Sequence, residues 1–376
     1  DFWKIYIKYN IKKQTKIYLI IISITILTQL PILLPYNEMF KIPLIFMWLI
    51  TIIFNVANGV SLKDNFMKKI LIIGTFNIWI LCVSIIDNMY LKSYHFISIN
   101  LAFIFYVAGY SSKVKKKEVF EECIVKYTAI LTTIITISIY LEYFSGISFN
   151  SATSYIYTSK NSIGGLVVIS FILLDSVKKN IINKYLKFIM QSWFILFILL
   201  LQHRAGMVCI VVYFILNKCN KIKVNIRTIV LIGISLMVLL IFREEMINFL
   251  CWALRINNTN NINDFSSGRV SLMIDALVVF KENFLIGVPN YYVDNLYVCL
   301  LAEYGLIGCS ILFVYFILII KDYYYFKKNT NKKIIRNLIL PMFILAFFEA
   351  LAPFGPGGIY CVFWYLYGIN DYDIKR

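Results

Sequence analysis

The chain has 376 residues, of which 60% are hydrophobic and 15% are charged, and its mean hydropathy is +0.75. Soluble domains carry about 25% charged residues. Apolar runs near or above ~18 residues recur along this sequence, which excludes a soluble domain and predicts a polytopic helical membrane protein. The formal net charge of +17 fits the positive-inside bias of such proteins, and nucleic-acid binding is not expected.

The cysteines and histidines argue against a metal site or a disulfide framework. The eight cysteines form no CxxC pair, and most of them lie inside apolar runs, where cysteine behaves as a small hydrophobic residue. The only histidines are His95 and His203, which excludes a histidine-rich metal site. We therefore expect neither a metal nor a cofactor.

The hydropathy pattern predicts an all-α fold of about twelve membrane-spanning helices in one transmembrane domain, 1–376. Lysines precede the first apolar run, and no small-residue cleavage site follows it, so we expect a retained anchor. The predicted spans are 17–36, 42–60, 70–87, 96–111, 124–143, 162–175, 188–202, 205–217, 228–242, 294–320, 337–352 and 358–369.

The distribution of basic residues supports this arrangement. With both termini on the cytoplasmic side, the inner segments hold 29 of the 37 Lys and Arg residues. Helix length and the same charge rule both favour a helix break at 202–206. An unbroken helix over 188–217 would be about 45 Å long, whereas a hydrocarbon core is ~30 Å thick. It would also put the lysines before it and after it on opposite sides of the membrane. The basic residues assigned to the outer side are Lys41, Lys92, Lys160, Arg204, Arg243, Arg255, Arg269 and Lys281.

Arginine is enriched on the outer side. Four of the seven arginines are assigned there, against four of the thirty lysines. Arginine presents a planar fork of donors that suits phosphate and carboxylate groups. This bias indicates an anionic ligand on the outer face.

One large outer loop, 243–293, is predicted between the ninth and tenth spans. It contains two short amphipathic segments, 243–255 and 268–283, and the second places Leu272, Leu277 and Phe280 on one face. Ser266 or Ser267 could cap that helix. Both segments are predicted to lie on the outer leaflet, and packing against the outer ends of the bundle is an equally good and compatible interpretation.

Two arginines are candidate functional residues. Arg204 lies at the predicted helix break, where a helix N-terminus favours anions, although it could simply extend to the membrane interface. Arg269 opens the second amphipathic segment, and the alternative for it is a solvated loop arginine.

Carboxylates at the outer side are the second group of candidates. Asp294 could act as a general base or orient a sugar hydroxyl, or it could cap a helix that begins at Asn295. Glu303 lies nine residues further on, about 180° around the helix, so we expect a buried partner contact there and not a shared site. Lys160, Asn161 and Glu349 also lie at predicted outer edges, and each is a weak signal alone.

Three stretches together resemble the bacterial O-antigen polymerase and O-antigen ligase family. They are KNSIGGLVV at 160–168, LLLQHRAGMVCIVVYFIL at 199–216 and SGRVSLMIDALVVFKENFLIGVPNYYVDNLYVCLLAEYGLIG at 267–308. The third stretch is the most specific. The resemblance implies a GT-C-like membrane fold and a metal-independent, inverting glycosyltransferase of a bacterial cytoplasmic membrane, with its active site facing outward.

The resemblance also implies substrates and residue roles. Donor and acceptor would both be undecaprenyl-diphosphate-linked glycans, and a chain-length regulator protein is a further partner to consider. Arg204 and Arg269 would hold the diphosphate, while Asp294 would accept the proton of the attacking hydroxyl or position it. The expected substrate contacts come from Lys160, Asn161, His203, Arg255, Tyr291, Tyr292 and Asn295.

Two alternatives stay open. Ligases typically carry histidine at the position of Asp294, so the aspartate favours a polymerase of O-antigen, capsule or exopolysaccharide repeat units over a ligase. A lipid-linked oligosaccharide flippase should show an internal repeat and charges at mid-membrane, and the sequence shows neither pattern.

Overall fold

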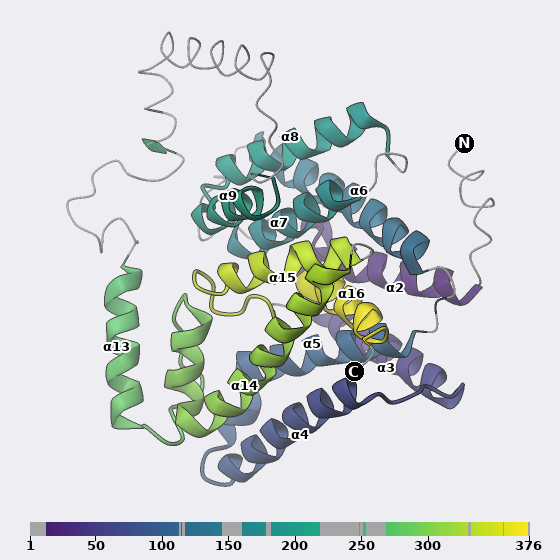
Figure 1. Cartoon of the computed structure of the whole chain (residues 1–376). Helices are drawn as coiled ribbons and strands as arrows, with labels where there is room; N and C mark the ends of the chain where they lie inside the picture. Colours follow the sequence, from purple (N-terminus) through teal and green to yellow (C-terminus); the bar gives the residue numbers. More distant parts are fainter. Residues whose placement is uncertain are drawn as a thin grey trace.

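The computed structural model describes residues 13–112, 114, 117–144, 160–177, 182–218, 248, 251–252, 268–329, 332–355 and 357–374. Within these ranges the regular structure is entirely helical, and the helices form the bundle shown in Figure 1. The α-helices are α2 (Lys13–Leu27), α3 (Asn37–Ala57), α4 (Asp64–Ser84), α5 (Tyr94–Ser111), α6 (Lys117–Phe144), α7 (Lys160–Ser176), α8 (Lys184–Leu200), α9 (Arg204–Lys218), α13 (Arg269–Glu282), α14 (Leu296–Lys328), α15 (Lys333–Leu345) and α16 (Cys361–Asp371). Three 3₁₀ helices accompany them: η1 (Pro31–Tyr36), η2 (Asn88–Lys92) and η5 (Gly357–Tyr360).

Helices lie at eleven of the twelve predicted spans, and the span at 228–242 lies outside the described residues. In the described part of the chain, four helical stretches are long and apolar enough to cross a membrane: Met39–Ala57, Asp64–Ser84, Lys117–Glu142 and Leu296–Lys328. The predicted break is confirmed, because α8 ends at Leu200, Gln202 has a positive φ of 51° and α9 begins at Arg204. The bundle is therefore that of a helical membrane protein.

Two predicted spans are wrong in extent. The first, 17–36, ends as an α-helix at Leu27, and η1 follows, where Pro31 and Pro35 lack the amide hydrogens that an α-helix needs. The eleventh, 337–352, ends as a helix at Leu345. The residues after Leu345 form an irregular loop whose backbone groups are bonded by side chains of other helices.

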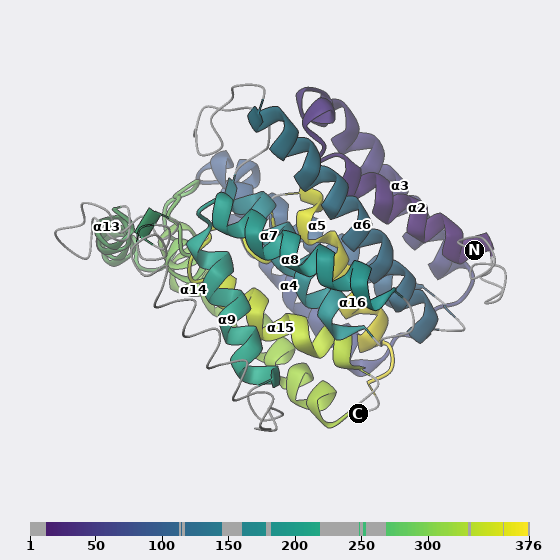
Figure 2. The same ribbon diagram turned by 90° about the horizontal axis from the view of Figure 1, so that it is seen from above.

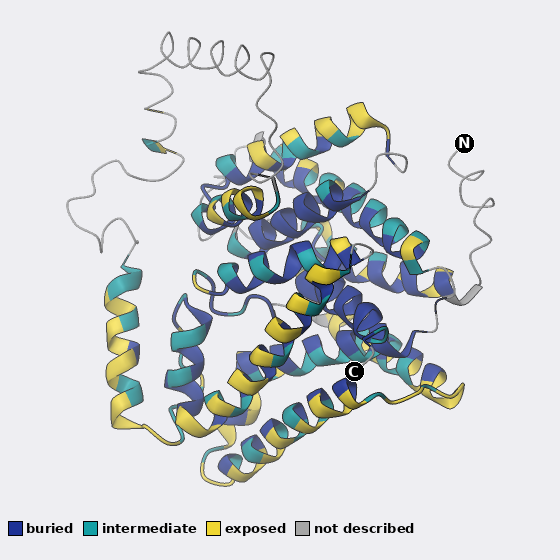
Figure 3. Cartoon of the chain, viewed as in Figure 1, coloured by how far each residue is buried: buried dark blue, intermediate teal, exposed yellow. Residues whose placement is uncertain are grey.

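The centre of the bundle is formed by helices too short to match a membrane by themselves. All eleven residues of α16 are buried, and α7 is buried along most of its length (Figure 3). The longer helices α4 and α14 keep exposed apolar faces in the same view. A helix enclosed by protein need not match the hydrocarbon thickness, which accounts for the short central elements.

Close packing of α5 against α16 depends on two glycines. A Cβ atom on Gly109 would come within 2.1 Å of the Tyr365 carbonyl oxygen, and one on Gly368 within 2.1 Å of the Tyr106 carbonyl oxygen. Small residues of this kind let helix backbones approach each other in membrane proteins. The pair fixes the buried α16 at the centre of the molecule.

A second glycine pair shapes the stretch that carries the strongest resemblance. Gly305 interrupts α14 with a φ of 59°, and Gly287 forms a turn with a φ of 81°. The turn packs into the interruption, where the Val288 amide donates to the Ala302 carbonyl at 2.9 Å. A Cβ atom on either glycine would meet the other segment's backbone within about 2.5 Å. These contacts fix the chain on either side of Asp294.

Helix α13 lies along the edge of the bundle beside α14 (Figures 1 and 2). Its buried side chain is Ala276, and Met273 and Val279 pack with it against α14. Leu272 and Leu277, which the sequence placed on one apolar face, are exposed. These two leucines therefore do not pack against the bundle, and the interpretation of the segment as a helix on the outer leaflet stays a prediction. Gly268 precedes the helix as its N-cap residue, and Ser266 and Ser267 lie outside the described residues.

Candidate functional site

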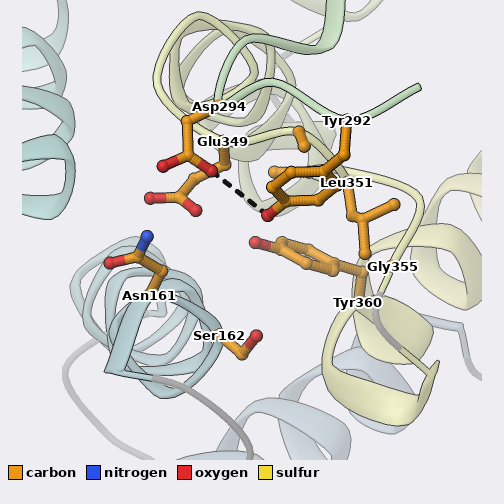
Figure 4. A pocket seen from close by; sticks show the side chains of 10 residues that line it. Asn161, Ser162, Tyr292, Asp294, Glu349, Leu351, Gly355 and Tyr360 are labelled. Atoms are coloured by element: carbon orange, nitrogen blue, oxygen red, sulfur yellow. Dashed lines mark hydrogen bonds between the residues drawn. The ribbon is translucent and has the colours of Figure 1, made fainter. Parts of the chain in front are cut away.

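A polar pocket of about 250 Å³ opens where the ends of α7, α14 and α15 meet (Figure 4). Asn161 and Ser162 come from the first turn of α7, while Tyr292 and Asp294 come from the segment that leads into α14. The remaining lining residues come from the loop after α15 and from η5: Glu349, Ala350, Leu351, Ala352, Gly355 and Tyr360. We call the end of the bundle that holds this pocket the pocket end.

The loop 346–355, which we call the pocket loop, is fixed by hydrogen bonds from surrounding helices. Such bonds are needed because buried backbone carbonyls must be paired. Side chains of α5, α13 and α16 donate to it directly, as does that of Asn295 before α14. The bonds run from the Leu296 amide to the Ala346 carbonyl at 2.8 Å, from Arg269 Nη1 to the Phe348 carbonyl at 2.8 Å, from His95 Nε2 to the Ala350 carbonyl at 3.0 Å and from Trp364 Nε1 to the Pro353 carbonyl at 2.7 Å.

Arg269 and Asp294 form an ion pair beside the pocket. Arg269 Nη2 lies 2.9 Å from Asp294 Oδ2, and the two side chains are 23% and 26% exposed. The other terminal nitrogen of Arg269 donates to Phe348 in the pocket loop, so both arms of the guanidinium are engaged. Asp294 Oδ1 accepts a hydrogen bond of 3.1 Å from the Tyr292 hydroxyl.

Two tyrosines, Tyr292 at the pocket and Tyr90 at the Gly287 turn, have raised pKa values. Desolvation of its hydroxyl and the negative charge of Asp294 raise the pKa of Tyr292 well above its ordinary value. Burial, followed by the charges of Asp87 and Glu303, raises the pKa of Tyr90 to about 12. Tyr292 can therefore donate to Asp294, and Tyr90 donates at 2.8 Å to the Gly287 carbonyl in the turn.

A second acidic side chain, Glu349, shares the pocket. Its Oε1 lies 3.3 Å from Nε2 of the buried His203, at the start of α9. In the sequence, Glu349 is only a weak candidate for a functional residue, because it is an isolated acid near the end of a predicted span. The tertiary structure puts it beside Asp294 and Asn161 (Figure 4).

Five of the predicted site residues lie at the pocket or contact residues that line it. Asn161, Tyr292 and Asp294 line the pocket, Arg269 pairs with Asp294, and His203 reaches the site through Glu349. Arg204 is half-buried at the first residue of α9. Lys160 begins α7, its side chain lies outside the described part, and Arg255 lies outside it altogether.

Two predicted substrate contacts have other roles in the fold. Asn295 caps α14, since its side chain accepts from the Val298 amide at 3.1 Å, and it donates to the Phe347 carbonyl. Tyr291 packs against the small cluster between α13 and α14, and its carbonyl accepts from Cys299. The alternative role of Asp294 as the cap is wrong, because the helix begins one residue later than that role requires.

Glu303 is buried away from the pocket, as expected. Its Oε2 lies 2.5 Å from His95 Nδ1, and Oε1 accepts from the Ser93 hydroxyl. Among the described residues, His95, Cys299 and Glu303 are a group that could hold a metal ion, with ligand atoms within 4.8 Å of one another. The 2.5 Å approach of His95 to Glu303 is that of a hydrogen-bonded pair, and it links α5 to α14 behind the pocket loop.

The pocket and the four membrane-length helices together define a helical membrane protein with a polar site at one end of its bundle. Comparison with protein-family models found no match, and comparison with curated proteins found none either.

Proposed function

We propose that the chain is a glycosyltransferase that polymerises undecaprenyl-diphosphate-linked oligosaccharide repeat units on the outer face of a bacterial cytoplasmic membrane. The observation that carries the proposal is a convergence of three stretches. Asn161 belongs to 160–168, His203 to 199–216, and Arg269 and Asp294 to 267–308. These stretches, which carry the resemblance, meet around one pocket although 98 residues, 169–266, lie between the first and the last.

The proposed reaction needs few groups from the protein. The acceptor hydroxyl oxygen bonds to the anomeric carbon of the donor, and the bond from that carbon to the phosphate oxygen breaks, so that the diphosphate lipid leaves with the electron pair. A pocket carboxylate takes the hydroxyl proton. Cationic donors stabilise the charge that develops on the leaving diphosphate.

Arg269 and the helix ends suit the diphosphate part of this scheme. The guanidinium of Arg269 lies beside the pocket in an orientation fixed by Asp294 and by the Phe348 carbonyl. Helices α7 and α9 both begin at the pocket end, and a helix N-terminus attracts anions through its free amides. Arg204 is the first residue of α9, which makes it the second candidate for a phosphate contact.

The size of the pocket bears on what could enter it. At about 250 Å³ it is smaller than ligand pockets that enclose a whole drug-sized molecule, which measure roughly 300–1,000 Å³. It suits the reacting sugar and its neighbouring phosphate. The remainder of each oligosaccharide and the lipid would lie outside the pocket, toward α13 and the bilayer.

Reconstitution tests the proposal. Purified protein is mixed with undecaprenyl-diphosphate repeat units alone, with and without EDTA, and the products are separated on a gel. A ladder in both conditions is the expected result. A single transfer that requires an added lipid or protein acceptor would instead assign a ligase, and movement of lipid-linked glycan across vesicles without bond formation would assign a flippase.

A further inference from the structure

Glu349 is placed to act on a ligand in the pocket. Its carboxylate lies between Asp294 and Asn161 in the close view of the site (Figure 4). Its side chain is only 11% exposed, at a point where the pocket loop is bonded to other helices on either side. An ionisable group is costly to bury at such a place, which marks Glu349 as a functional candidate.

The environment of His203 determines which of its nitrogens carries a proton. A Cβ atom on Gly164 would lie 2.2 Å from His203 Nδ1, and one on Gly206 would lie 2.5 Å from it. This nitrogen is therefore packed against both glycines. Nδ1 is buried and has no hydrogen-bond partner among the described residues. A proton on Nδ1 would be buried without an acceptor, so the neutral tautomer with its proton on Nε2 is favoured. That proton points at Glu349 Oε1, 3.3 Å away.

Asp294 is less available to take a proton than Glu349. One of its oxygens is paired with the Arg269 guanidinium at 2.9 Å, and the other accepts from the Tyr292 hydroxyl at 3.1 Å. Asp294 therefore holds Arg269 in the orientation that reaches the Phe348 carbonyl. Glu349, by contrast, contacts His203 Nε2 and faces the pocket.

We infer that Glu349 is the general base of the site and that His203 is the residue that positions it, while Asp294 positions Arg269. The inference rests on the proposed function. In the step, the acceptor O–H bond breaks and its proton goes to a Glu349 oxygen. The acceptor oxygen bonds to the anomeric carbon, and the carbon–oxygen bond to phosphate breaks with its electron pair on the departing diphosphate. Gly164 and Gly206 supply the space that His203 occupies.

The first test compares the two carboxylates. Glu349→Gln keeps the size of the side chain and should lower kcat by about 100-fold or more with little change in the donor KM, the range expected for loss of general-base catalysis. Glu349→Ala should regain part of its rate in formate, which returns a carboxylate to the vacated space, whereas Asp294→Ala should not. A Glu349→Gln enzyme with wild-type kcat, or formate rescue of Asp294→Ala instead, would overturn the inference.

The second test separates positioning from structural support. His203→Leu removes the donor to Glu349 and should lower kcat, and His203→Gln, which can present an amide N–H, should recover part of it. The loss caused by His203→Leu should vanish when Glu349 is already Gln, because there is then no carboxylate to position. If the fold-losses in kcat of the two single variants multiply in the double variant, His203 has a structural role. Melting temperatures in detergent show that each variant is folded.

The outcomes distinguish this inference from the proposed function. If the wild-type chain forms polymer and Glu349→Gln is unimpaired, the polymerase assignment stands and Glu349 is not the base. If the folded wild-type chain forms no glycosidic bond from the lipid-linked units, the proposed function and this inference both fall.

Discussion

The shape of the Arg269 side chain matters as much as its charge. Its two terminal nitrogens contact Asp294 Oδ2 at 2.9 Å and the Phe348 carbonyl at 2.8 Å, and a lysine ammonium cannot reproduce that fork. Arg269→Lys should lower polymerisation at least tenfold, because the pocket loop and Asp294 lose their common donor. Arg336→Lys, at the start of α15, is the matched control. Equal initial rates for Arg269→Lys and wild type would contradict the assigned role.

A second residue-scale prediction concerns pH. Asp373 lies between Lys117 Nζ at 2.6 Å and Lys332 Nζ at 2.5 Å. Partial burial alone would raise the pKa of Asp373, but hydrogen bonds from the two lysines and their charges outweigh it and hold the pKa below the ordinary value of 3.8. The stabilisation is therefore full above pH 3.8 and is lost as the pH falls through the lower pKa of the folded state.

Asp373→Asn is expected to reduce the melting temperature at pH 7. The gap to wild type should close at pH values below the folded-state pKa, where the native carboxyl is also protonated. Unfolding in detergent, followed by circular dichroism across the acid range, measures the gap. A gap that keeps its size at the lowest pH would rule out the charge as its cause.

At the scale of elements, the contact between α5 and α16 should tolerate no added methyl group. A Cβ atom at Gly368 would lie 2.1 Å from the carbonyl oxygen of Tyr106, which belongs to a helix backbone and cannot move alone. Gly368→Ala should destabilise the protein by about 1–3 kcal/mol or more, as overpacking does. Gly74 is the control, because a Cβ atom there would meet nothing within 4 Å, and Gly74→Ala should be neutral or gain up to ~1 kcal/mol. Equal melting temperatures for both variants would contradict the packing argument.

A buried charge cluster joins three helices at the end opposite the pocket. Lys69 of α4 lies 2.6 Å from Asp322 of α14 and 2.9 Å from Asp371 of α16, and all three side chains are fully buried. Tyr367 donates to Asp322, and Asn65 to Asp371. Asp322 lies near the C-terminal end of α14, beyond the interruption at Gly305, whereas the pocket lies beside the N-terminal end of that helix.

Lys69→Met should be strongly destabilising, by ~3–5 kcal/mol, because it leaves two buried carboxylates without their cation. Adding Asp322→Asn and Asp371→Asn to Lys69→Met should recover much of that loss. Thermal unfolding in detergent of the single and triple variants provides the comparison. A triple variant less stable than Lys69→Met would show that the cluster matters through its shape and not through its charge.

At the scale of the whole molecule, hydropathy and charge were enough to predict the helical fold. They located helices at eleven spans and the break before Arg204, because both follow from local composition and from the length limit on a membrane helix. They could not predict the pocket loop, since its conformation depends on donors such as His95 and Trp364 that are distant in sequence. The place of Glu349 in the pocket could not be predicted either, because it too depends on residues distant in sequence. The face of α13 that packs against the bundle depends on small residues of α14, including Ala302.

The predicted orientation of the bundle is testable with one exposed position before α4, Leu62, and one after it, Asn88. In a variant whose native cysteines are replaced, an impermeant maleimide should label Asn88→Cys in intact cells and should label Leu62→Cys only after lysis. The expectation follows from the positive-inside distribution of lysines. The reverse labelling pattern would place the pocket on the cytoplasmic side and contradict the proposed location.

We propose a pocket that breaks a sugar–diphosphate bond and forms a glycosidic bond. The most direct measurement counts both events, by quantifying the undecaprenyl diphosphate released and the new linkages formed from labelled repeat units. We predict one lipid diphosphate per linkage, inversion at the anomeric carbon, and loss of both products together in Arg269→Lys and Glu349→Gln. Retention of the donor's anomeric configuration, or release of lipid without linkage formation, would contradict it.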